Sequence, residues 1–172
     1  RTLQSGVSAF NNTAIGFNAG KYCTSDANTL IGSQAGDALV SGNVNTAVGF
    51  QALTSATTAV GNTIVGNEAG FKITTGEGNV MIGRYAGYFN GSTTTAGTTT
   101  GSNVICIGAY SYPSSATVDS EFTLGNNSIT NLRCNDTSIS SLSDQRDKTN
   151  IVGVPLGLAF INTLRPVSFD WD

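Results

Sequence analysis

The chain contains no histidine, and this absence decides most of the chemistry that its residues could do. A serine–histidine–aspartate triad, a cysteine–histidine protease site and most catalytic zinc sites all need an imidazole, so these classes of site are excluded. The three cysteines, Cys23, Cys106 and Cys134, are far apart and odd in number, which fits neither a disulfide framework nor metal-ligand spacing. We expect them to be small buried apolar residues, and we expect no metal and no cofactor.

Aromatic side chains are the next candidates for a binding site. Residues 88–102 read YFNGSTTTAGTTTGS, a stretch of low complexity and no charge that predicts an exposed loop. Tyr88 and Phe89 at its start, with Tyr110 and Tyr112 further on, are suited to stacking on a sugar or contacting a cell-surface receptor. The alternative is that these rings only anchor the base of a surface excursion.

The composition excludes several kinds of partner. The 172 residues include 8 Lys and Arg against 11 Asp and Glu, and charged residues are only 11% of the chain. This balance leaves no basic surface for nucleic acid, and no apolar run approaches the 18 residues that span a bilayer. We therefore expect no nucleic-acid partner and no membrane insertion. Because the sequence begins at Arg1, we expect it to be a piece of a longer protein.

An internal repeat predicts the architecture. Successive copies begin with an asparagine, at steps of 16, 17, 17 and 17 residues, and read NTAIGFNAG, NTLIGSQAG, NTAVGFQAL, NTIVGNEAG and NVMIGRYAG from Asn12, Asn28, Asn45, Asn62 and Asn79. We place a sixth copy, NVICIG, at Asn103 after a longer step of 24, and a seventh trace at Phe122.

Each copy predicts one coil of a β-solenoid or β-roll, which makes residues 1–131 an all-β domain. The short apolar run suits a strand, and the glycine after it marks a turn that requires positive φ. A second short strand is expected before the next asparagine, so that each coil has two strands and two turns. Coils of this kind stack about 4.8 Å apart through ladder hydrogen bonds. The asparagines are expected to form an amide ladder or to satisfy turn amides rather than to hold a ligand.

Two apolar rows run through the copies and predict an oligomer. One row is formed by Ile15, Ile31, Val48, Val65 and Ile82, and the other by Ala14, Leu30, Ala47, Ile64 and Met81. Because neighbouring residues of a strand point to opposite faces, one chain covers one row and a neighbouring chain has to cover the other. The simplest assembly is a homotrimer packed or intertwined around an axis, although periodicity does not fix the number.

The repeat is lost from about residue 132, which predicts a second, small α+β segment over 132–172. Apolar residues at helical spacing occupy 153–164, and the VSFDWD run at 167–172 alternates like a strand. This segment looks truncated, because only about 40 residues remain after the repeats end.

The repeats resemble those of trimeric autotransporter adhesins and of many phage fibres. The strings SDQRDKTNI (143–151) and LRPVSFDW (164–171) closely resemble the endosialidase-type intramolecular chaperone of the self-cleaving peptidase S74 family. This domain ends many phage tail spikes and fibres. The resemblance implies that it trimerises, directs the folding of the fibre upstream and then cuts itself off.

Carried onto this chain, the resemblance makes Ser143 the nucleophile, Lys148 its base and Leu142–Ser143 the scissile bond. Without the resemblance, the alternative interpretation is that Ser143 and Asp144 form a helix N-cap and that Lys148 lies on a solvated face. A lysine base has to be neutral, so its pKa of about 10.4 must fall through burial or neighbouring cations. Residues five apart do not face each other on a helix or strand, so either the chain turns sharply or the pair forms across two subunits. Cleavage is expected in the full-length parent, and this piece lacks the rest of the chaperone.

Together these patterns predict a structural and host-attachment protein of a virus: a tail fibre assembled in the host cytoplasm and carried on the virion. The alternative is a bacterial or cellular surface adhesin with the same β-roll and an autoproteolytic or permanent C-terminal cap, located at the cell surface. An ice-binding solenoid would need rows of Thr-x-Thr, whereas Thr13, Thr29, Thr46 and Thr63 give one threonine per coil.

Overall fold

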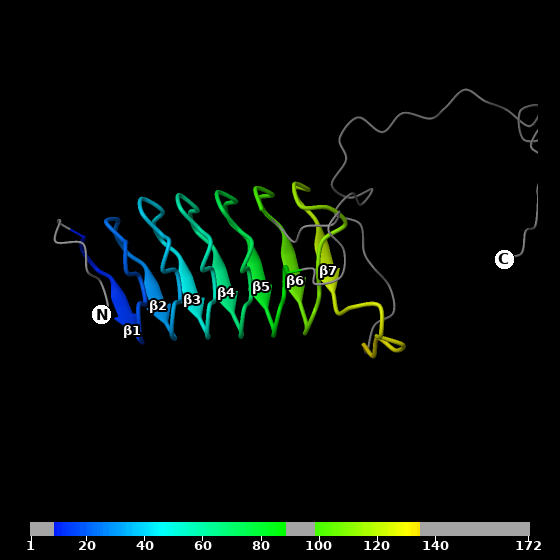
Figure 1. Ribbon diagram of the computed structural model, residues 1–172. Coiled ribbons are helices and arrows are strands. Elements are labelled where there is room, and N and C mark those ends of the chain that lie inside the picture. The colour runs from blue at the N-terminus through cyan, green and yellow to red at the C-terminus, as the bar shows by residue number, and fades with distance from the viewer. Residues whose placement is uncertain (1–8, 89–98, 135–172) are drawn as a thin grey trace, which may run out of the picture. The chain divides into compact units, whose positions relative to one another are not determined.

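The computed structural model describes residues 9–88 and 99–134, which form a parallel β-solenoid (Figure 1). Each coil contributes one strand of three residues. The strands are β1 (Thr13–Ile15), β2 (Thr29–Ile31), β3 (Thr46–Val48), β4 (Thr63–Val65), β5 (Val80–Ile82), β6 (Ile105–Ile107) and β7 (Phe122–Leu124). β-Branched residues dominate them, which suits the extended backbone. The predicted all-β solenoid is confirmed for this part of the chain.

The seven strands form one parallel sheet in the order β1-β2-β3-β4-β5-β6-β7, and Figure 1 shows them side by side in a row. Equivalent residues of successive copies pair, as Thr46 does with Thr63 and Val48 with Val65. The Thr46 N–H donates to the Asn62 carbonyl at 2.8 Å, and the same bond recurs from coil to coil. A strand can pair with its successor in parallel only because the chain returns once around the coil in between.

The prediction of a second strand in each coil is wrong for the described residues. The part of each coil that follows the strand, here called the return arm, passes through turns instead. Gly36, Leu53 and Gly70 have φ of 54, 55 and 57°, so the extended backbone of a ladder is interrupted there. The return arms are still bonded to one another at intervals, for example from the Gly36 N–H to the Ala52 carbonyl at 2.9 Å.

The core of the solenoid lies between the sheet and the return arms. The middle residues of the strands point inward, and Leu30, Ile64 and Met81 are fully buried. Leu39, Leu53, Ala56 and Ile73 of the return arms are also fully buried and belong to the same apolar cluster. The flanking strand residues point outward, as the alternation predicts. We call the surface made by the first and third residues of β1–β7 the outer face.

The opening asparagines of the second to fifth copies are buried and form the predicted amide ladder; they are Asn28, Asn45, Asn62 and Asn79. The Asn45 side-chain oxygen accepts both the backbone N–H and the side-chain NH₂ of Asn62 at 3.0 Å. The Asn62 oxygen accepts the Asn79 N–H at 2.9 Å, and the Asn79 oxygen accepts the Val104 N–H at 2.9 Å. Each buried amide therefore satisfies backbone groups of the next coil, which is why a polar residue is stable inside this core.

The sixth copy is displaced by one residue from the predicted register. β5 pairs with β6 through Val80 and Ile105, so the residue equivalent to Asn79 is Val104, 25 positions later, and not Asn103. The Gly83 turn decides this register. Both positions of this turn need glycine, because Gly83 and Gly108 have φ of 127 and 119° and a Cβ on Gly83 would lie 2.6 Å from the carbonyl carbon of Gly108. The position of the asparagine, in contrast, accepts valine.

The cysteine prediction is right for two residues and wrong for the third. Cys23 and Cys106 are buried in the apolar cluster, and burial raises the pKa of the Cys106 thiol to about 11. Cys134 is exposed.

The chain divides into two units, residues 1–132 and 133–172. The predicted helix at 153–164 and the strand at 167–172 lie outside the described residues, so the α+β segment and the boundary at 131 stay predictions. In the described part of the chain, no helix has the length and apolar character needed to cross a bilayer.

Candidate functional site

A column of residues with a left-handed backbone conformation runs along the edge of the solenoid, just after the glycine turns. Each coil places the second residue after its turn glycine at this position with positive φ; the column contains Asn18, Gln34, Gln51, Glu68, Tyr85 and Tyr110. Because the coils stack in register, the side chains at equivalent positions of successive coils contact each other. Gln51 donates to the Gln34 side chain at 3.2 Å, and the Tyr85 hydroxyl donates to the Glu68 carboxylate at 3.0 Å. The column thus changes from amides to aromatic rings toward the C-terminal coils.

Tyr85 is at the centre of a ladder of rings. Its ring stacks on Tyr110 with centroids 5.1 Å apart and an interplanar angle of 17°, and on Tyr88 at 5.6 Å and 28°. Tyr88 also meets Phe71 edge-on at 5.6 Å. These separations lie within the range for favourable ring pairs. We call Phe71, Tyr85, Tyr88 and Tyr110 the aromatic ladder.

Two cations lie over the aromatic ladder. The Arg84 guanidinium is 4.9 Å from the Tyr110 centroid and 5.5 Å from that of Tyr85, and it also donates a hydrogen bond to the Tyr110 hydroxyl. The Lys72 ammonium is 5.5 Å from Phe71 and 5.8 Å from Tyr88. All four distances fit cation–π contacts. Rings, hydroxyls and positive charges therefore share one edge of the solenoid.

The Glu68 carboxylate adds one acceptor to this edge. Its hydrogen bond to the Tyr85 hydroxyl, followed by burial, raises the pKa of Tyr85 above its usual value. The phenol is consequently neutral at physiological pH and keeps its proton as a donor.

The structure brings together two of the four predicted contact residues. Tyr88 and Tyr110 both stack on Tyr85, which the sequence analysis did not single out. A signal for Tyr85 did exist, because it lies 25 residues before Tyr110, the same spacing as that between Gly83 and Gly108. Tyr112 is half-buried, two residues beyond Tyr110, and Phe89 lies outside the described residues.

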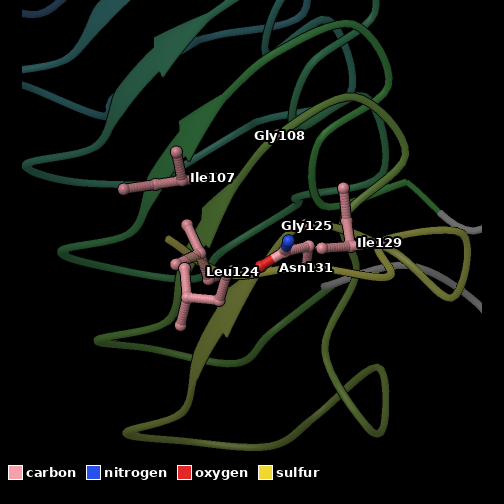
Figure 2. A pocket seen from close by; sticks show the side chains of 7 residues that line it. Ile107, Gly108, Leu124, Gly125, Ile129 and Asn131 are labelled. Atoms are coloured by element: carbon pink, nitrogen blue, oxygen red, sulfur yellow. The ribbon is translucent and has the colours of Figure 1, made fainter. Parts of the chain in front are cut away.

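The last coil carries an apolar pocket of about 350 Å³ between β6, β7 and the segment that follows (Figure 2). Ile107, Leu124 and Ile129 line it, and the Ile129 N–H donates to the Asn126 carbonyl at 3.0 Å to turn the chain back over the coil. In Figure 2, Ile129 lies beside Gly125, where a Cβ would collide with it. The end of the solenoid is thus partly covered by its own chain, with apolar surface left open.

The predicted catalytic residues lie outside the described part of the chain. Leu142, Ser143 and Lys148 all fall in the segment after residue 134, so the dyad and its scissile bond stay predictions. Among residues 9–88 and 99–134, no three carboxylate or cysteine side chains gather in a way that would hold a metal ion.

Comparison with protein families identifies the C-terminal segment. Residues 143–172 match the model of the family described as Peptidase_S74, chaperone of endosialidase. No curated protein and no solved structure matches the chain significantly. The match covers both strings that were singled out in the sequence, and it begins at Ser143. Residues 143–172 are therefore similar to the chaperone of endosialidase, and they follow a parallel β-solenoid in the same chain.

Proposed function

We propose that this protein is part of a phage-type tail fibre, in which the solenoid is the shaft or tip and the C-terminal chaperone directs assembly as a homotrimer. The match of residues 143–172 carries this proposal, because the chaperone family is associated with trimerisation and with tail-fibre-like proteins. A solenoid fits a shaft, since each coil contacts only its neighbours and length grows by adding repeats. The protein would be assembled in the host and carried on the virion.

We further propose that the chaperone is released by a single self-cleavage between Leu142 and Ser143. The Ser143 hydroxyl would attack the carbonyl carbon of Leu142, and Lys148 in its neutral form would take the hydroxyl proton. The C–N bond between Leu142 and Ser143 would then break, and the leaving Ser143 nitrogen would take the proton from Lys148. Water would hydrolyse the resulting ester, which leaves a carboxylate on Leu142 and restores the hydroxyl of Ser143 beside its free amine. In support of this bond, the family match begins at Ser143.

The intact mass of the full-length natural protein tests the cleavage. The wild type is expected to give two fragments, with Ser143 as the new N-terminus, whereas Ser143→Ala and Lys148→Ala should each leave the chain uncut. Ser141→Ala, two residues upstream, is the control and should be cut like the wild type. An uncut wild-type trimer would instead make residues 132–172 a permanent cap and would favour the surface adhesin.

Host attachment is proposed to use the aromatic ladder. Sugars stack their apolar faces on aromatic rings, and Arg84 and Lys72 beside the rings suit a glycan that carries acidic groups. The Arg84 guanidinium can bind a carboxylate in a bidentate manner, which an ammonium cannot. A host surface glycan of this chemistry is therefore the receptor class that the described residues favour.

Binding of labelled protein to a glycan array checks the attachment site. Tyr110→Ala is expected to lower the signal for acidic glycans about tenfold, because a lost ring contact of about 1.4 kcal/mol corresponds to that factor. Tyr22→Ala is the matched control: Tyr22 is also exposed and has the Lys21 ammonium 4.6 Å from its ring, but it belongs to the first coil. Equal binding by wild type and Tyr110→Ala would exclude the ladder as the receptor site.

A further inference from the structure

The outer face of the sheet is apolar, although no part of the described chain buries it. Its third-residue row includes Ile15, Val65, Ile82 and Leu124, which are 59, 37, 39 and 50% exposed. On the opposite side of the same strands, the middle residues Leu30, Ile64 and Met81 have no exposed surface. Contiguous exposed apolar surface of this kind marks an interaction site in soluble proteins.

None of the residues of β1–β7 carries a charge. The strand sequences are TAI, TLI, TAV, TIV, VMI, ICI and FTL, so the outer face offers only threonine, aliphatic and phenylalanine side chains. A charged partner would gain no ion pair on this face and would lose hydration. The partner surface is therefore uncharged as well.

The outer face also repeats with the spacing of the coils. Seven strands at about 4.8 Å give a stripe about 29 Å long, with an aliphatic residue at the same place in every coil. A surface fits such a stripe along its whole length only if it has the same spacing. Another copy of this chain has this spacing by construction, whereas an unrelated globular surface does not.

We infer that the outer face of β1–β7 is where copies of this chain pack against one another, aliphatic row against aliphatic row. The inference deepens the proposed function and rests on its trimeric chaperone: joining the C-termini makes the chains parallel, so β4 of each copy lies at the same height. The outer face then becomes the inner surface of the fibre, while the aromatic ladder stays at an edge beside the glycine turns.

The oligomeric state of the 172-residue chain tests the inference by sedimentation equilibrium. Val65→Lys, at the third residue of β4, is expected to convert the wild-type trimer to monomers, because a buried ammonium without a partner opposes association. Val40→Lys is the matched control, since Val40 is a valine of similar exposure, 45%, on a return arm. This variant should remain trimeric. Far-UV circular dichroism of each variant reports whether the solenoid is intact.

Disulfide trapping provides a second test that does not depend on a disruptive charge. In a Cys134→Ser background, Val65→Cys should form an interchain disulfide under copper-catalysed air oxidation, whereas Val40→Cys should stay monomeric on a denaturing gel. Cys23 and Cys106 are buried and serve as internal controls.

The outcomes separate this inference from the proposed function. A trimeric Val65→Lys together with no disulfide from Val65→Cys would overturn the packing face but leave a trimer held by the chaperone segment. A monomeric wild type would overturn the packing face as well, and cleavage at Leu142–Ser143 in the full-length protein would then decide the remaining proposal separately.

Discussion

Gly49→Ala is expected to be the most damaging single substitution in the solenoid. Gly49 follows β3 with φ of 138°, a backbone conformation that residues with a side chain rarely adopt. A Cβ there would lie 2.6 Å from the carbonyl carbon of Gly66 and closer still to its oxygen, and neither backbone atom can move without breaking the ladder. The cost should reach about 4 kcal/mol, because about 1–3 kcal/mol for the steric clash adds to about 1–3 kcal/mol for the strained backbone.

Thermal unfolding followed by far-UV circular dichroism measures this effect. For a chain of this size, a loss of 4 kcal/mol lowers the Tm by about 8–16 °C. Gly78→Ala is the control, because Gly78 also has positive φ, 63°, but nothing lies within 4 Å of a Cβ built on it. This control should cost only about 1–2 kcal/mol, the strain of a left-handed backbone. A Tm equal for both variants would show that steric contact between coils is not what makes the glycine necessary.

Asn45→Ala is expected to have the second largest effect. The Asn45 side chain donates to the Asn28 side-chain oxygen at 3.1 Å and to the Ala59 carbonyl at 2.8 Å, and it accepts the Asn62 N–H at 3.0 Å. Alanine leaves these buried groups without the partner that the structure gives them. Each orphaned group costs about 1–3 kcal/mol, so a total of about 3–5 kcal/mol is expected.

Urea unfolding compares Asn45→Ala with Asn67→Ala. Asn67 is half-buried just after the Gly66 turn and lies outside the buried ladder, so its substitution should change the free energy of unfolding by less than about 1 kcal/mol. Hydrogen exchange adds a local readout. The Asn62 N–H, which donates to Asn45 in the wild type, should lose protection in Asn45→Ala before amides of β6 do, because coils interact only with their neighbours. Unchanged protection there would contradict a structural role for the ladder.

Much of the fold could be predicted because it follows from local chemistry. A three-residue apolar strand, a glycine with positive φ and a buried asparagine recur at a fixed step, and that step alone requires stacked parallel coils. The alternation of inner and outer rows follows from strand geometry and needs no tertiary information. The sequence pattern could not exclude the second strand that was expected in each coil. The left-handed backbone at residues such as Leu53 depends on the packing of the return arms, and leucine gives no local signal for it.

The candidate binding site was predicted only in part, because its central residue depends on how coils stack. Tyr88 and Tyr110 attracted attention as aromatic residues near a loop, but Tyr85 becomes central only when it stacks between them. Which residue stacks on Tyr85 depends on how the sixth copy, with its longer step, is aligned with the fifth. Aligned on its asparagine, this copy puts Ala109 beside Tyr85; aligned on its glycine, it puts Tyr110 there.

The sequence by itself determined that this chain is a solenoid with an apolar inside, an apolar outer row and a C-terminal segment that is similar to the chaperone of endosialidase. Only the tertiary structure decided the register after residue 88, and with it the burial of Cys106 and the meeting of Tyr85 and Tyr110. The physical reason is that a slip of one residue turns every side chain of a strand to the opposite face. The turn excludes that slip because Gly83 and Gly108 both have a positive φ that requires glycine, whereas the asparagine position tolerates Val104.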